Sequence, residues 1–151
     1  MGYSEGLDAE ISREVGEEKK TVDFQEEKSK RRPFHIWAVG ENMYRLKLKA
    51  SMIGALERKY GKNVLNLVSD EEGLPPLSVM LTIIQAAASP WNHGMDYNKV
   101  KTVYDEWCDY GGNQMELLSE IIMPTLVVSG FFTKKQGDMM MEELKSMDET
   151  I

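Results

Sequence analysis

The chain has 151 residues, of which 42% are apolar, and it carries a formal net charge of −7. This length allows one domain, or one domain with tails, and the apolar fraction is enough for a core. The acidic balance argues against a general nucleic-acid surface, which needs a basic excess. The single cysteine, Cys108, excludes an internal disulfide and a cysteine-rich zinc site.

The N-terminus and the apolar runs of the sequence do not predict export or membrane insertion. The first residues are polar and lack an apolar core, so we expect no secretory signal. The longest apolar runs, such as Val79 to Ala88, are too short to span a bilayer. We therefore expect no membrane partner and a cytoplasmic location.

Residues 1–33 are dominated by charged residues and contain few large apolar ones. Such a segment buries too little apolar area to offset its ordering entropy, so we predict a disordered tail, with at most a transient helix around residues 11–24. The basic cluster Lys28–Arg32 has the chemistry to contact RNA or anionic lipid. A solvated linker is the favoured interpretation.

Two strand-like runs follow, Phe34 to Val39 and Tyr44 to Lys49, with Gly40-Glu41-Asn42 between them. Their composition and spacing predict a β-hairpin. An isolated hairpin is marginal in water, so this one must pack on helices or pair with another chain. The residues that we expect at a self-association surface are Phe34, Ile36, Trp37, Tyr44, Leu46 and Leu48.

The rest of the chain shows helical periods separated by turns. We predict a helix from Ser51, as its N-cap, to Tyr60, with Gly61 after its end. Further helices are predicted at 63–68, after Ser78, after Asp96 or Asn98, and after Asn113, the last one interrupted by Pro124. The apolar positions predict a core that includes Leu46, Leu48, Ile53, Leu56, Ile83, Ile84, Trp107, Leu118 and Ile122.

No set of residues predicts catalysis or metal binding. His35 and His93 are far apart in the sequence, and we expect structural or surface roles for them. Cys108 beside Trp107 is expected to be a small buried apolar residue. We therefore predict no enzyme activity and no cofactor, and a function in binding macromolecules.

The predicted fold is mainly α, a small helical bundle with an N-terminal β-hairpin (α+β), flanked by charged flexible tails. The predicted boundaries are a tail at 1–33, a helical domain at 34–133, and an acidic, methionine-containing tail or helix at 134–151.

Three segments carry a resemblance to a known family: LxLxxSMIxxLExxYGKN at 46–63, NHGxxxxxVxxxxDEW followed by GG at 92–112, and VSGFF at 128–132. In this order, residues 34–133 resemble the tail assembly chaperones of long-tailed bacteriophages and prophages, of the type found in phages of Gram-positive bacteria. The charged segment 1–33 is not part of this resemblance.

The resemblance implies a protein that acts in the host cytoplasm and is absent from the mature virion. Such chaperones coat the tape measure protein and help to recruit tail tube subunits, in many cases through a longer frameshifted form, and they tend to form homo-oligomers. An alternative is a phage or prophage regulatory or adaptor protein that binds nucleic acid through Lys28–Arg32. A virion component is a third, weaker option.

Methionine-rich helical surfaces accept apolar side chains of varied shape. The chain has 11 methionines, several of them near its C-terminus. We therefore predict a partner-binding surface on this last segment, made by Met139, Met140, Met141, Leu144 and Met147.

Overall fold

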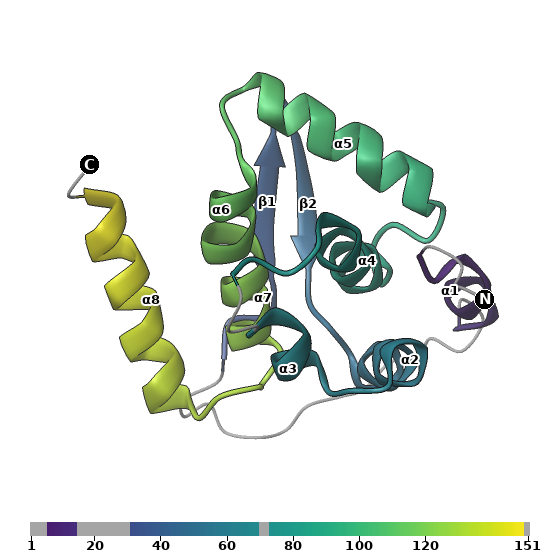
Figure 1. The fold of residues 1–151 in the computed structure, drawn as a ribbon, viewed down its shortest axis with the longest axis horizontal. Helices are drawn as coiled ribbons and strands as arrows, with labels where there is room; N and C mark the ends of the chain where they lie inside the picture. The colour runs from purple at the N-terminus through teal and green to yellow at the C-terminus, as the bar shows by residue number, and fades with distance from the viewer. Residues whose placement is uncertain (1–5, 15–30, 70–72, 150–151) are drawn as a thin grey trace.

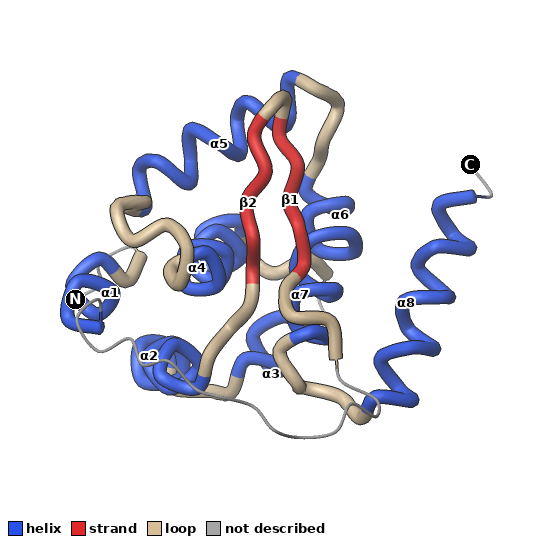
Figure 2. Tube along the Cα trace, turned by 180° about the vertical axis from the view of Figure 1, so that it is seen from behind, coloured by secondary structure: helices blue, strands red, loops and turns tan. Residues whose placement is uncertain are grey.

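Helices surround a two-stranded antiparallel hairpin in the computed structural model, which describes residues 6–14, 31–69 and 73–149 (Figures 1 and 2). The elements in chain order are α1 (Asp8–Glu14), β1 (His35–Val39), β2 (Asn42–Leu46), α2 (Ala50–Tyr60), α3 (Val64–Val68), α4 (Leu77–Ala88), α5 (Tyr97–Asp109), α6 (Gln114–Glu116), the π-helical turn η2 (Leu117–Ile122), α7 (Met123–Val128) and α8 (Lys134–Glu149). The prediction of a mainly helical α+β fold with a hairpin is confirmed.

The hairpin has one buried face and one exposed face. Trp37 pairs with Tyr44 across the strands, and Trp37, Val39 and Leu46 are at most 1% exposed. The helix α4 contacts β2, whereas η2, α7 and α5 contact β1, so the hairpin is stabilised by helices of its own chain. The opposite face carries exposed side chains, namely Ile36, Ala38, Met43 and Arg45.

The second strand begins two residues earlier than predicted and ends at Leu46. The turn contains only Gly40 and Glu41. After Leu46 the backbone leaves the hairpin, because the Lys47 amide donates to the Ala87 carbonyl at 3.0 Å and the Leu48 amide donates to Ser129 Oγ at 2.8 Å. The last residues of the predicted strand, 47–49, therefore belong to an extended linker, which α4 and the end of α7 hold in place.

The helix α2 begins two residues earlier than predicted. Its N-cap is Lys49, which makes no side-chain capping bond, and Ser51 lies inside the first turn. Ser78 likewise lies inside α4, whose N-cap is Pro76. Both predicted serine caps are wrong. The predicted C-terminal end of α2 is confirmed, since Gly61 is left-handed and its amide donates to the Glu57 carbonyl.

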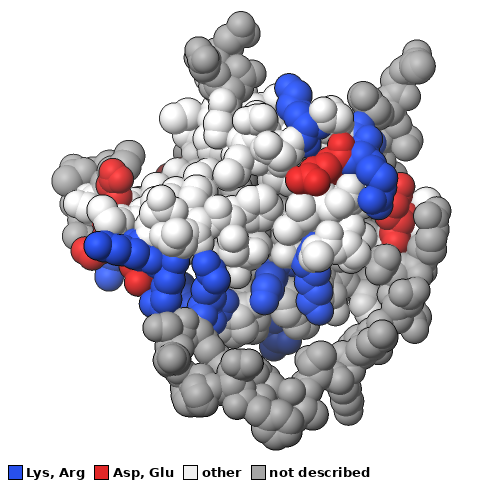
Figure 3. All heavy atoms as spheres, turned by 90° about the horizontal axis from the view of Figure 1, so that it is seen from below, with Lys and Arg blue, Asp and Glu red and all other residues white. Residues whose placement is uncertain are grey.

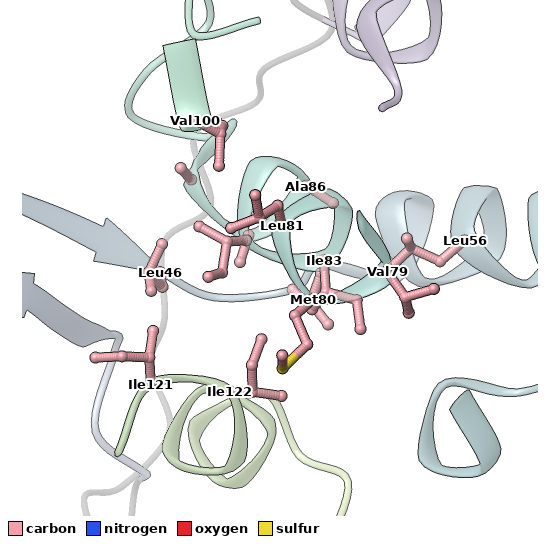
Figure 4. Packing of buried hydrophobic residues seen from close by; sticks show 14 of the residues in the cluster. Leu46, Leu56, Val79, Met80, Leu81, Ile83, Ala86, Val100, Ile121 and Ile122 are labelled. Carbon is pink, nitrogen blue, oxygen red and sulfur yellow. The ribbon is translucent and has the colours of Figure 1, made fainter. Parts of the chain in front are cut away.

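The helix α4 is the centre of the core. Of its residues only Ile83 and Ile84 were in the predicted core, but every residue from Val79 to Ala88 is buried. In Figure 4 the Met80 side chain points toward Ile122 of η2, and Leu46 of β2 lies opposite Ile121. Burial on all sides fits the central position of α4, which contacts β2, α2, α5 and η2.

Most of the predicted core is confirmed. Leu46, Leu48, Leu56, Ile83, Ile84 and Ile122 are each at most 1% exposed. Three other predicted residues, Ile53, Trp107 and Leu118, are only partly buried at the edge of the core. In the η2 region Leu117 occupies the buried position instead of Leu118. The reason is that a π-turn advances more residues per turn than the 3.6-residue period assumes.

The start of the chain differs from the predicted tail. Residues 6–14 are described, and within them Leu7 and Ile11 are 2% and 4% exposed, as part of the same core. This part of residues 1–33 is therefore packed on the domain, because two apolar residues one helical turn apart meet an apolar surface that the composition of the segment does not reveal. Residues 15–30 lie outside the described residues.

Candidate functional site

The π-helical turn η2 and the start of α7 form the floor of a groove on the surface. Pro124, in the first turn of α7, has no amide hydrogen to donate to the Glu120 carbonyl four residues earlier. His35 of β1 reaches this carbonyl, and its Nε2 lies 2.8 Å from the oxygen. A carbonyl only accepts, so Nε2 carries the hydrogen. The imidazole thus replaces a helical donor that proline removes, which confirms a structural role for His35.

The helix α8 forms the wall of the groove. Thr133 and Gln136 begin it with a capping box, in which the Gln136 amide donates to Thr133 Oγ1 and the Thr133 amide donates to Gln136 Oε1, both at 3.0 Å. Gly137 lets α8 approach α7 closely, because a Cβ at this position would lie 2.8 Å from Cγ1 of Val127. Only the first turns of α8 lie close to α7, and the rest of the helix diverges from the body (Figures 1 and 2).

Between the floor and the wall lies a groove with a volume of about 490 Å³. Met141 and Leu144 line it from α8, and His35 and Pro124 line it from the floor. A smaller pocket of about 100 Å³ continues the groove toward Val127 and shares Met141 with it. The groove is thus a half-open apolar channel that runs along one side of α8.

Charged side chains of both signs form the rim of the groove. Arg32 and Lys145 are basic, whereas Glu142 and Asp138 are acidic. Asp138 also accepts a hydrogen bond from Lys134 one turn earlier, at 3.1 Å. Arg31, just before the groove, donates from Nη2 to the Phe132 carbonyl at 2.6 Å and thereby ties the chain before β1 to the α7–α8 connection.

Burial lowers the pKa of His35 below its ordinary value of 6.5. The hydrogen bond to Glu120 opposes this shift, and the positive charge of Arg32 adds to it. His35 Nδ1 is buried and has no hydrogen-bond partner among the described residues. The imidazole is therefore neutral at pH 7, with Nε2 as its donor.

Residues 32–151 match DUF6096, a family of unknown function. The chain belongs to this family. No curated protein and no solved structure matches it. The DUF6096 region contains both the floor and the wall of the groove, whereas the packed segment 6–14 lies outside it.

Within the DUF6096 region, the structure separates the residues that we predicted for partner binding. Met141 and Leu144 line the groove. Met139 is 63% exposed, and Met140 is half-buried without lining the groove. The side chain of Met147 lies outside the described part of the chain. Two of the five predicted residues thus line the groove, and the partner-binding surface stays a prediction.

The predicted self-association surface is not one surface in the DUF6096 domain. Trp37, Leu46 and Leu48 are at most 1% exposed and lie in the core of their own chain, so for them the prediction is wrong. Their apolar faces are covered by helices, which removes the need for a second chain. Phe34 and Tyr44 are half-buried, and Ile36 is 38% exposed.

Sequence analysis missed the floor of the groove. Pro124 was predicted to kink the helix, and His35 was assigned a structural role, but nothing in the sequence linked the two residues. The signal is the proline itself, since a proline inside a helical pattern leaves one carbonyl that needs another donor. Which of the two histidines reaches that carbonyl depends on the tertiary structure.

The described part of the chain contains no cluster of three or more His, Cys, Asp or Glu residues that could hold a metal ion. Nor is any helix of the described residues long and apolar enough to cross a membrane.

Proposed function

We propose that this protein is a tail assembly chaperone of a long-tailed bacteriophage or prophage, which binds the tape measure protein and helps to recruit tail tube subunits. The order of the segments at 46–63, 92–112 and 128–132 supports the proposal, because it resembles that of such chaperones. In this proposal the protein acts in the host cytoplasm, and the mature virion does not contain it.

The observation that carries the proposal is the apolar groove beside α8. An α-helix with its side chains is about 10 Å across, and amphipathic helices dock into apolar grooves through residues one and two turns apart. Met141 and Leu144 are flexible apolar side chains three residues apart on the wall. A surface of this kind accepts helices of varied sequence, as the coating of a long partner requires.

The attachment of α8 is suited to the same task. Its first turns are held by the capping box and by the close approach at Gly137, whereas its later turns diverge from the body (Figure 1). A wall that is anchored at one end can adjust its distance from the floor at the other end. The mixed charges of the rim suit a partner with both acidic and basic residues.

The test is co-expression with the tape measure protein encoded in the same genome. We expect the wild-type chain to increase the soluble fraction of the tape measure protein. The double variant Met141→Glu/Leu144→Glu places two charges in the groove and should abolish this increase. Met139→Glu makes the same kind of change on the exposed side of the same helix and should retain it.

Two outcomes contradict the proposal in different ways. If the wild-type chain does not improve the solubility of the tape measure protein, the chaperone function is wrong. If the groove variant rescues as well as wild type, and circular dichroism shows that both are folded, the groove is not the binding surface. A chain that ends at Lys135 tests the whole of α8 in the same assay.

A nucleic-acid-binding adaptor is the second candidate, and a charged surface favours it. Basic side chains outnumber acidic ones on the face seen in Figure 3. Residues 47–62 hold five basic residues, and Glu57 is their one acidic residue. By contrast, Arg31 of the predicted basic segment donates to a backbone carbonyl of its own chain. Salt-dependent binding of labelled DNA or RNA, weakened by Lys49→Glu/Lys62→Glu, would support this candidate against the first.

A further inference from the structure

The packed N-terminal segment is held by specific polar contacts as well as by apolar burial. Gln85 of α4 is only 1% exposed, and its Oε1 accepts a hydrogen bond from the Leu7 amide at 3.0 Å. Its Nε2 donates to Asp8 Oδ1 at 2.5 Å and to the Met95 carbonyl at 3.4 Å. One buried side chain thus recognises both the backbone and the carboxylate of the segment.

The start of α5 provides a second contact with the same carboxylate. The amide of Tyr97, the first residue of α5, donates to Asp8 Oδ1 at 3.3 Å. Amides in the first turn of a helix have no helical acceptor and favour a negative charge. Asp96 already caps α5 through the Lys99 amide, so Asp8 serves a different donor of the same helix end.

The segment also has a strict steric requirement. Gly6 has a φ of +75°, and a Cβ at this position would lie 2.5 Å from Gln85 Oε1 and 2.7 Å from Tyr97 Cβ. A side chain larger than hydrogen therefore does not fit. The ligand therefore has the form Gly-Leu-Asp-x-x-Ile, in which x is any residue. Its recognised features are a glycine without a Cβ, the buried side chains of Leu7 and Ile11, and the Asp8 carboxylate.

The site and its ligand belong to different parts of the chain. Gln85, Met95 and Tyr97, which we call the arm site, lie in the DUF6096 region, and the ligand segment at 6–14 lies before it. Residues 15–30 connect them, and at full extension a chain of this length reaches about 55 Å. A domain of roughly 120 residues has a radius of gyration of only about 14 Å. The arm is thus long enough to reach a neighbouring molecule.

We propose that the arm site is a peptide-binding site that also takes residues 6–14 of a second copy of this chain, so that neighbouring copies exchange their N-terminal arms. The contacts in an exchanged pair are the same as those within one chain, so exchange needs no new complementarity. Within one chain, the covalent connection raises the effective concentration of the arm, into the millimolar range for short linkers, which favours the internal arm in dilute solution. Exchange is favoured where copies lie side by side.

The arm site and the α8 groove lie on opposite sides of the molecule (Figure 1). Arm exchange therefore leaves the groove open, and the inference stands whether or not the proposed chaperone function is correct.

The test uses two full-length variants. Gly6→Val disables the arm and leaves the arm site intact, whereas Gln85→Leu disables the arm site and leaves the arm intact. In a mixture, the intact arm of one chain can dock only on the intact site of the other. We expect each variant alone to be monomeric and the mixture to form a 1:1 complex of twice the monomer mass in analytical ultracentrifugation.

The control is a mixture of Gly6→Val with the double variant Gly6→Val/Gln85→Leu, which has no intact arm and should stay monomeric. A complex in this control, or a monomeric first mixture in which circular dichroism shows both chains folded, would overturn the proposal.

A second measurement avoids any change at Gln85. A labelled peptide of residues 1–14 should bind the full-length Gly6→Val chain, and an Asp8→Lys peptide should bind at least about tenfold more weakly, as expected for loss of a charged hydrogen bond. If neither peptide binds to the folded chain, or both bind equally, the arm site does not recognise the segment as proposed.

Discussion

The linker between β2 and α2 provides a sharp test of the packing, because one of the two hydrogen bonds that hold it depends on a single hydroxyl group. Ser129 Oγ, at the end of α7, accepts a hydrogen bond from the Leu48 amide at 2.8 Å and donates to the Thr125 carbonyl at 2.6 Å. Leu48 is 1% exposed, so its amide lies away from bulk water. The variant Ser129→Ala removes the acceptor and leaves the amide buried without a partner.

The expected loss of stability in Ser129→Ala depends on which groups lose their hydrogen-bond partners. The Thr125 carbonyl keeps a second donor, since the Ser129 backbone amide lies 3.0 Å from it. Only the Leu48 amide is orphaned, and a buried unsatisfied donor costs about 1–3 kcal/mol. For a chain of this size each kcal/mol corresponds to a decrease of about 2–4 °C in Tm.

Urea unfolding at constant m-value measures the effect. The matched control is Ser51→Ala, which removes an exposed hydroxyl from the first turn of α2 and should change the free energy of unfolding by less than about 0.5 kcal/mol. If Ser129→Ala costs no more than Ser51→Ala, the Leu48–Ser129 hydrogen bond does not hold the linker, and the argument is refuted.

Three further predictions concern the core, the groove and the gene. Leu56→Ala, at a position with 0% exposure, should cost about 2–5 kcal/mol in urea unfolding, and a loss below about 1 kcal/mol would mean that α2 is packed differently. Burial lowers the pKa of His35 below 6.5, so between 6.5 and the folded-state pKa the unfolded chain binds a proton that the folded chain does not. The contribution of His35 to stability is therefore complete above pH 6.5 and is lost as the pH falls through this range. His35→Gln should flatten this part of the pH dependence, and equal pH profiles for the wild type and His35→Gln would contradict the prediction. The two lysine codons at Lys134 and Lys135 can form an A-rich slippery run, at which we predict a ribosomal frameshift. We expect a second, longer product by immunoblot. A gene without an overlapping reading frame would contradict the prediction.

Local capping signals predicted several helix ends correctly. Asp96 and Asn113 accept from the amides three residues later, and Gly61 is left-handed at the end of α2. These features depend on atoms within a few residues of each other, so the sequence contains the information. Serine caps failed at Ser51 and Ser78, because each helix starts one residue before the serine.

The candidate site was only partly predictable. The methionine-rich period pointed to α8, and its capping box is local. The groove itself depends on His35 reaching Glu120 across 85 residues and on Gly137 meeting Val127. Periodicity also could not place the buried residues of η2, since a π-turn shifts the phase of the pattern.

By itself, the sequence determined the hairpin, the helices and most of the core, because alternation and helical periods follow from the geometry of one strand or one helix. The tertiary structure decided which distant residues the polar groups contact: Ser129 for the Leu48 amide, His35 for the Glu120 carbonyl, and the Leu7 amide for the side chain of buried Gln85. Each of these three hydrogen bonds joins residues more than 75 positions apart. The physical reason is that a buried polar group needs a partner somewhere, but the sequence does not specify which distant residue packing brings within hydrogen-bond distance.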